Sequence, residues 1–170
     1  AFSGLVSPRL ASAPSHHVIE AWGHADGLPR MGVHSIVQGP EGFLWLGLDG
    51  QIVRFDGHRF RSFPLPRADG SVYQQPTAMV FDSQEKLWVG TLNGGLFFFD
   101  GTEFRRASDK DLLGLPIHFL LPEEDGGLWL GTRSGLRYFY EGFVKPPPEA
   151  LVKGQLDGTS YWIYIDPENN

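Results

Sequence analysis

The sequence predicts an all-β chain: a β-propeller fragment of about three four-stranded antiparallel blades, with partial strands at both ends. The first observation is a Leu-Trp-(Leu/Val)-Gly core that occurs three times, with its tryptophans at Trp45, Trp88 and Trp129. Their spacings of 43 and 41 residues match the length of one propeller blade. Two further observations are the tight turns within each repeat and the unbroken apolar character of the inner strands.

Each repeat carries the turn signals of an antiparallel meander. Asp56-Gly57 and Asp100-Gly101 stand between apolar runs, and Glu141-Gly142 takes the same place in the third repeat. Asp-Gly favours a type I′ hairpin, because both central residues of that turn need a positive φ. A second polar turn precedes each Leu-Trp core. Each repeat is therefore predicted to form four short strands joined by tight turns.

The strand that carries the tryptophan is apolar at every position, as in Phe43 to Leu46, whereas a half-exposed strand alternates. Both faces of this strand are therefore expected to be covered, as they are when blades pack face to face. The last strand of the first repeat, Arg59 to Phe63, does alternate, which suits the outer edge of a blade. We expect the repeated tryptophans and glycines to be structural residues: Trp45, Gly47, Trp88, Gly90, Trp129 and Gly131.

The two ends of the chain read as incomplete blades. Because closing a propeller takes about four to eight blades, we expect the chain to be part of a longer protein. Open blade faces also predict self-association of the fragment. The predicted segments are a loose N-terminal stretch at 1–16, an incomplete propeller at 17–170 with an outer strand of a closing blade at 17–22, blade units at 31–63, 76–107 and 116–145, and the start of a further blade at 159–170.

Charge and composition exclude several function classes. The formal net charge of −6 argues against a nucleic-acid partner, which needs a positive field. The absence of cysteine excludes disulfides, thiolate metal sites and a cysteine nucleophile. No apolar run is long enough to span a bilayer, so we expect no membrane contact by this segment itself.

Candidate ligand-binding residues lie where propellers usually bind, on one rim formed by the loops after the second strands and by the connections between blades. Loops on a rigid scaffold commonly carry function. Two histidines stand near the start of first strands, which line the central channel in propellers. The predicted ligand-binding residues are His34, Asp49, Gln75, Asn93, His118, Arg133 and Ser134.

No catalytic residue, metal site or cofactor is predicted. The acidic run Glu123 to Asp125 lies in a predicted turn, where adjacent side chains point apart, which does not suit paired acid/base work. His16-His17 has no third ligand at metal-binding spacing. Nucleotide-binding, calcium-loop and zinc-protease motifs are absent from the sequence.

The repeats closely resemble the two-component regulator propeller repeat. The family's opening Asp-Gly-Leu-Pro is present at 26–29, and its closing Arg-Phe-Asp-Gly is present at 54–57. The Thr that follows Trp-x-Gly is present in the second and third repeats, whereas Leu48 replaces it in the first. The closing motif departs to Phe-Phe-Asp-Gly at 98–101 and Phe-Tyr-Glu-Gly at 139–142.

This resemblance implies a periplasmic sensor of a bacterial membrane-bound signalling protein. The output domain of such proteins is a hybrid or simple histidine kinase, or a GGDEF-type diguanylate cyclase, and it is not in this chain. The implied partner is a small-molecule signal, which in gut Bacteroidetes members is a carbohydrate fragment. Two alternatives stay open: a propeller enzyme, such as a lyase or a glycan-processing protein, and a passive protein-interaction scaffold.

Overall fold

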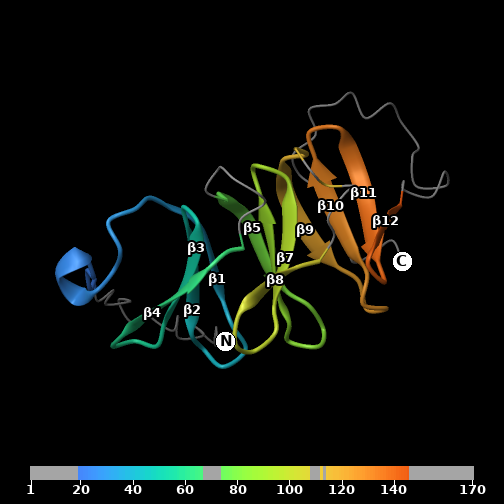
Figure 1. The fold of residues 1–170 in the computed structure, drawn as a ribbon. Coiled ribbons are helices and arrows are strands. Elements are labelled where there is room, and N and C mark those ends of the chain that lie inside the picture. The colour runs from blue at the N-terminus through green and yellow to red at the C-terminus, as the bar shows by residue number, and fades with distance from the viewer. Residues whose placement is uncertain (1–18, 67–73, 108–111, 113, 146–170) are drawn as a thin grey trace, which may run out of the picture.

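The computed structural model describes residues 19–66, 74–107, 112 and 114–145, and this part of the chain is almost entirely β-structure. Its strands form three separate four-stranded antiparallel sheets, in which every strand pairs with its neighbour in sequence. Figure 1 shows the sheets side by side in chain order, blade 1 in blue-green, blade 2 in green and yellow, and blade 3 in orange. The predicted all-β fold of about three four-stranded blades is therefore confirmed.

The strands have these bounds. Blade 1 consists of β1 (Val33–Gln38), β2 (Leu44–Leu48), β3 (Gln51–Phe55) and β4 (Phe60–Pro64). Blade 2 consists of β5 (Pro76–Phe81), β6 (Leu87–Thr91), β7 (Gly95–Phe99) and β8 (Phe104–Arg106). Blade 3 consists of β9 (Ile117–Pro122), β10 (Leu128–Thr132), β11 (Gly135–Tyr140) and β12 (Phe143–Lys145). A 3₁₀ turn, η1 (His24–Asp26), precedes them.

The outer strand expected at 17–22 would complete a closing blade, which is not among the described residues, so it stays a prediction. Residues 19–22 are not in a strand, and none of the three sheets of the described residues includes them. Instead the Trp22 ring meets the Phe55 ring edge-on, with 5.0 Å between ring centroids. The segments predicted at 1–16 and 159–170 lie outside the described residues.

The interface between blades 1 and 2 is an apolar core, here called the first interface. The second interface, between blades 2 and 3, is built in the same way, and all five residues of β6 are buried between the two. This explains why the tryptophan strand shows no alternation of polar and apolar residues. The first interface contains buried Trp45, Ile52, Phe63 and Leu65 from blade 1, or the loop after it, and Leu87, Val89, Phe97 and Phe104 from blade 2.

The repeated glycines let the first strand of the next blade approach closely. A Cβ placed on Gly47 would lie 2.7 Å from Cβ of Pro76 on β5. A Cβ on Gly90 would lie 2.5 Å from Cγ2 of Ile117 on β9. Both separations are far shorter than van der Waals contact, so a side chain at either position would push adjacent blades apart.

Each first strand carries the same irregularity. The register between first and second strand shifts by one residue at His34 in blade 1, at Thr77 in blade 2 and at His118 in blade 3. Such a bulge re-aims one side chain. His34 and His118 therefore occupy equivalent positions, and Thr77 takes that position in blade 2.

The tryptophans of blades 2 and 3 are each anchored by a carboxylate that lies six residues earlier. Trp88 Nε1 donates to Asp82 Oδ2 over 2.7 Å, and Trp129 Nε1 donates to Glu123 Oε1 over 2.5 Å. Trp88 is buried against Phe139 of blade 3, with 5.6 Å between ring centroids. The tryptophan thus joins its own turn to the neighbouring blade.

Replacing Trp88 by alanine should lower the free energy of unfolding by about 3–5 kcal/mol, because it leaves a cavity in the apolar core of the second interface. Urea denaturation followed by circular dichroism measures the loss. Leu92→Ala, on an exposed loop of the same blade, is the control and should change the value by less than about 0.5 kcal/mol. Equal, small effects of the two substitutions would contradict the placement of Trp88 between blades.

Blade 3 should lose stability in alkali through Tyr138. Burial, together with the hydrogen bond that its hydroxyl donates to Asp125, raises the pKa of Tyr138 to about 12. The unfolded chain ionises its tyrosines near pH 10. The stabilisation is therefore complete below about pH 10 and is lost as the pH rises toward 12. Urea midpoints measured across this range should fall more steeply for the wild type than for Tyr138→Phe, and parallel curves would contradict this assignment.

Candidate ligand-binding site

Three of the predicted binding residues meet on the rim between blades 1 and 2. His34 stands on the bulge of β1, Asp49 lies in the turn between β2 and β3, and Gln75 directly precedes β5. The distance from His34 Nε2 to Asp49 Oδ1 is 3.0 Å. Gln75 Nε2 donates to the same Asp49 oxygen over 3.4 Å and lies 3.1 Å from His34 Nε2. One carboxylate oxygen thus gathers an imidazole and an amide from two blades.

His34, Asp49 and Gln75 are here called the rim cluster. The loop that follows β6 holds the backbone of this cluster at Gln75. Asn93 Oδ1 accepts a hydrogen bond from the backbone N–H of Gln75 over 3.3 Å. The backbone N–H of Leu92 donates to the Gln75 carbonyl over 2.9 Å. Asn93 therefore positions Gln75, which places four of the seven predicted residues in one connected arrangement.

Gln74, which sequence reasoning missed, fixes the connection from inside. Its side chain is buried, and its Oε1 accepts a hydrogen bond from Thr91 Oγ1 over 2.8 Å. Its backbone carbonyl accepts from the N–H of Gly50 on blade 1 over 2.7 Å. The turn that holds Asp49 is thereby tied to the strand entry that holds Gln75. No repeat position in the sequence marks Gln74, so only the structure identifies it.

The other three predicted residues lie in blade 3. His118 occupies the bulge that corresponds to His34, and Arg133 is exposed in the loop after β10, where blade 1 has Asp49. The backbone N–H of Ser134 donates to Thr132 Oγ1 over 3.2 Å. Between the two histidine positions stands Thr77, whose hydroxyl donates to the backbone carbonyls of Gly90 and Ile117. These three residues therefore occupy, in blade 3, positions that correspond to those of the rim cluster and of Asn93.

The rim cluster is accessible and suited to polar recognition. The side chains of His34 and Asp49 are 28% and 44% exposed. Carboxylate, imidazole and amide groups together offer both donors and acceptors to a bound molecule. Within the described residues, no group of three His, Asp or Glu side chains could hold a metal ion. The same residues contain no helix long and apolar enough to cross a membrane.

The aspartates with depressed pKa values belong to turns and not to this site. Backbone N–H groups of Arg59 and His58 donate to Asp56 and lower its pKa. Backbone N–H groups of Glu103 and Thr102 lower the pKa of Asp100 in the same way. Perturbed carboxyl groups often mark acid/base catalysis, but here they stabilise the Asp-Gly hairpins.

Comparisons with solved structures identify the architecture. The extracellular domain of BT4673 from B. thetaiotaomicron, described as part of a hybrid two-component system, superposes on 84% of this chain with a TM-score of 0.69 and 19% identity. The corresponding domain of BT3049 from the same organism gives a TM-score of 0.60 over 78% of the chain at 22% identity. Virginiamycin B lyase from Staphylococcus aureus gives 0.58 over 70% at 16% identity.

The fold is a run of β-propeller blades. This chain spans 20% of the length of each extracellular domain and 42% of the lyase. At these identities the likeness concerns the fold. Neither protein-family models nor curated proteins gave a match to the sequence.

Removing the shared acceptor should release the rim cluster without unfolding the chain. In Asp49→Ala the His34 and Gln75 side chains lose their common partner, and exposed pairs of this kind contribute at most about 1 kcal/mol. Nuclear magnetic resonance should show shifts of the His34 ring and Gln75 amide signals, with an unfolding midpoint close to wild type. Arg133→Ala, one blade along the rim, should leave both signals unchanged; equal shifts in the two variants would contradict the cluster.

Proposed function

We propose that this chain is part of the ligand-sensing, extracytoplasmic domain of a bacterial membrane-bound signalling protein, and that its rim cluster contacts the signal. The observation that carries the proposal is the meeting of His34, Asp49 and Gln75 across two blades. The solved domains that share its fold, from the two B. thetaiotaomicron systems, are extracellular. The repeat motifs support the same placement in the periplasm.

The cluster is suited to exchange its internal hydrogen bonds for bonds to a ligand. Its contacts of 3.0–3.4 Å are partly exposed to solvent, and such contacts contribute little to folding stability. A ligand that replaces these internal hydrogen bonds therefore lowers the folding stability of the chain only slightly. Because His34 and Gln75 belong to different blades, such a ligand would also bridge the first interface. The signal that fits best is a small polar molecule or a carbohydrate fragment, which offers several hydroxyl groups.

The output of such a sensor would be a histidine kinase or a diguanylate cyclase encoded beyond residue 170. Reading the coding sequence on the C-terminal side tests this part of the proposal. A transmembrane segment followed by either output domain would support it. A stop codon directly after the last propeller blade would contradict it.

A propeller lyase is the second candidate, and a specific observation favours it. The carboxylate of Asp49 orients the imidazole of His34, which is the arrangement of a general base and its orienting group. Virginiamycin B lyase shares the fold. Product analysis after prolonged incubation separates the two functions, because a sensor returns its ligand unchanged and a lyase does not.

Binding of the signal should depend on the rim cluster. Calorimetric titration of the chain with oligosaccharides released from plant and bacterial cell walls should reveal a ligand that Asp49→Ala binds at least about tenfold more weakly. Glu124→Ala, in the turn between β9 and β10, is the matched control and should bind as the wild type does. If every ligand found binds both variants equally, the rim cluster is not the site.

A further inference from the structure

The rim opposite the rim cluster carries a second set of charged groups. In these antiparallel meanders the β1–β2, β5–β6 and β7–β8 turns lie at one end of the blades, and the β2–β3 turn that holds Asp49 lies at the other. Between blades 1 and 2 the first three turns surround a cavity of about 220 Å³, here called the turn cavity. Its charged and aromatic lining residues are Glu41, Arg54, Glu85, Trp45, Phe81 and Phe99.

Glu85 has a backbone conformation that favours glycine. Its φ is 60°, and its backbone N–H donates to the carbonyl three residues earlier in the β5–β6 turn. The equivalent positions of blades 1 and 3, with the same hydrogen bond, are Gly42 with a φ of 86° and Gly126 with a φ of 87°. Glycine adopts a positive φ without steric cost, whereas a residue with a Cβ is strained there. Blade 2 thus has a strained glutamate where the turn favours glycine, and this glutamate lines the turn cavity.

The same departure occurs at the second interface. Glu141, in the β11–β12 turn, has a φ of 49° and lines a cavity between blades 2 and 3 on the same rim. Within the part of the chain that the structure describes, Glu85 and Glu141 are the two residues other than glycine with a positive φ. Strained backbone conformations cluster at active sites and ligand-binding sites. The strain on this rim therefore coincides with the cavities between blades.

Arg54 provides the positive charge of the turn cavity. Its guanidinium carbon lies 4.8 Å from the Phe43 ring centroid and 5.6 Å from that of Trp45. None of the ion pairs among the described residues includes Arg54, although Glu41 and Glu85 line the same cavity. Packing on the two rings holds the guanidinium in place, and its N–H groups match the geometry of a carboxylate. Arg54 is therefore positioned to bind an anionic group.

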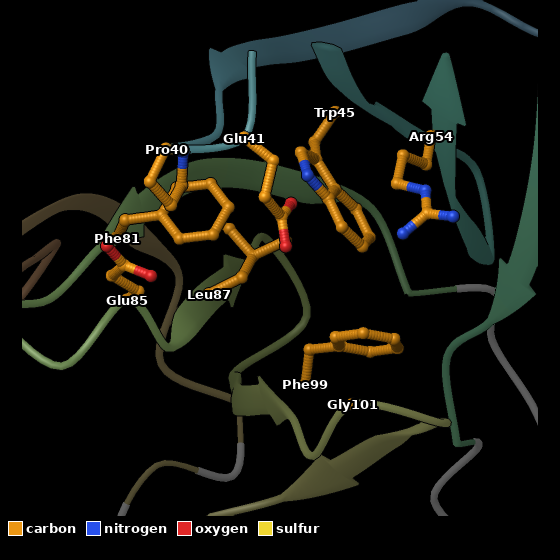
Figure 2. Close-up of a pocket in the computed structure, with 9 residues that line it drawn as sticks. All are labelled: Pro40, Glu41, Trp45, Arg54, Phe81, Glu85, Leu87, Phe99 and Gly101. Atoms are coloured by element: carbon orange, nitrogen blue, oxygen red, sulfur yellow. The ribbon is translucent and has the colours of Figure 1, made fainter. Parts of the chain in front are cut away.

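The lining of the turn cavity limits the size and the chemistry of an occupant. In Figure 2 Arg54 lies at one end of the row of labelled side chains and Glu85 at the other, with Glu41 between them and the Phe99 ring beneath. One positive and two negative side chains disfavour a simple anion, and the aromatic rings favour an apolar group. Cavities for drug-sized ligands measure about 300–1,000 Å³, so the turn cavity suits a smaller molecule.

We propose that the turn cavity binds a free amino acid with an apolar side chain. The carboxylate of the ligand pairs with Arg54, its ammonium group pairs with Glu41 and Glu85, and its side chain packs against Phe81 and Phe99. The turn cavity shares no residue with the rim cluster and lies on the opposite rim. The inference therefore does not rest on the proposed function, and the failure of either one would leave the other intact.

The test is a titration of the ¹⁵N-labelled chain with L-leucine, observed through the backbone amide signals of Glu41 and Glu85. These signals should shift saturably, with a dissociation constant on the order of 1 mM, while the signals of Asp49 and Gln75 stay in place. Three further probes each lack one feature: L-leucinamide the carboxylate, N-acetyl-L-leucine the ammonium group, and glycine the apolar side chain. Each should bind at least about tenfold more weakly than L-leucine. The absence of a saturable shift, or equal affinity for L-leucine and any of the three, would overturn the proposal.

Two substitutions locate the binding. Arg54→Met keeps an apolar stem beside the rings but removes the donors, so it should weaken the binding of L-leucine by about tenfold and abolish the preference over L-leucinamide. Glu85→Gly removes the carboxylate and relieves the strained φ, so the affinity should fall by about tenfold while the urea midpoint of unfolding rises. A loss of binding in this variant cannot be a loss of folding. Glu124→Ala, an exposed glutamate of the β9–β10 turn, is the control for both measurements and should match the wild type. Unchanged affinity in Arg54→Met or Glu85→Gly would overturn the proposal.

Discussion

The apolar packing of one blade against the next is the interaction on which the rest of the structure depends. Each blade is a simple meander, and a lone four-stranded sheet has no neighbour against which to bury either face. At the first interface Trp45, Ile52 and Phe63 meet Leu87, Val89 and Phe97, all of them buried. Burial of apolar surface stabilises by about 25 cal/mol per Å². It also fixes the distance between blades, and this brings His34 within reach of Gln75.

The rim cluster uses positions at which the blades differ from one another. The bulge of the first strand is common to all three blades, but it carries histidine in blades 1 and 3 and threonine in blade 2. The acidic anchor of the tryptophan is present in blades 2 and 3, whereas blade 1 has Gly39. The His34 position is exposed, so the packing framework tolerates a change there, whereas Gly39 is buried against Phe81 and Trp45. The repeat thus provides a rigid scaffold, and its exceptions provide polar groups that a ligand can use.

The sequence was sufficient for the sheets and for part of the rim. Tryptophan spacing and Asp-Gly turns predict the three meanders, because both signals are local. Repeat equivalence placed His34, Asp49, Gln75 and Asn93 on one rim, but their mutual hydrogen bonds depend on the distance between blades, which no local pattern encodes. The buried Gln74 was missed for the same reason. The meaning of Gly39 becomes visible only after the structure shows that Asp82 holds Trp88. The strand expected at 17–22 stays a prediction, because a strand needs a pairing partner and the closing blade that would supply it is not among the described residues.

The claim that packing across the first interface holds the two blades together is tested most directly by a double-mutant cycle. Phe63 of β4 and Phe99 of β7 belong to different blades, and their ring centroids lie 5.0 Å apart. Unfolding free energies of Phe63→Ala, Phe99→Ala and the double variant yield the coupling between them. The account predicts a favourable coupling of about 0.5–1.5 kcal/mol, typical of an aromatic pair in contact. Strictly additive effects would contradict it, because they would mean that the blades do not pack against each other at this point.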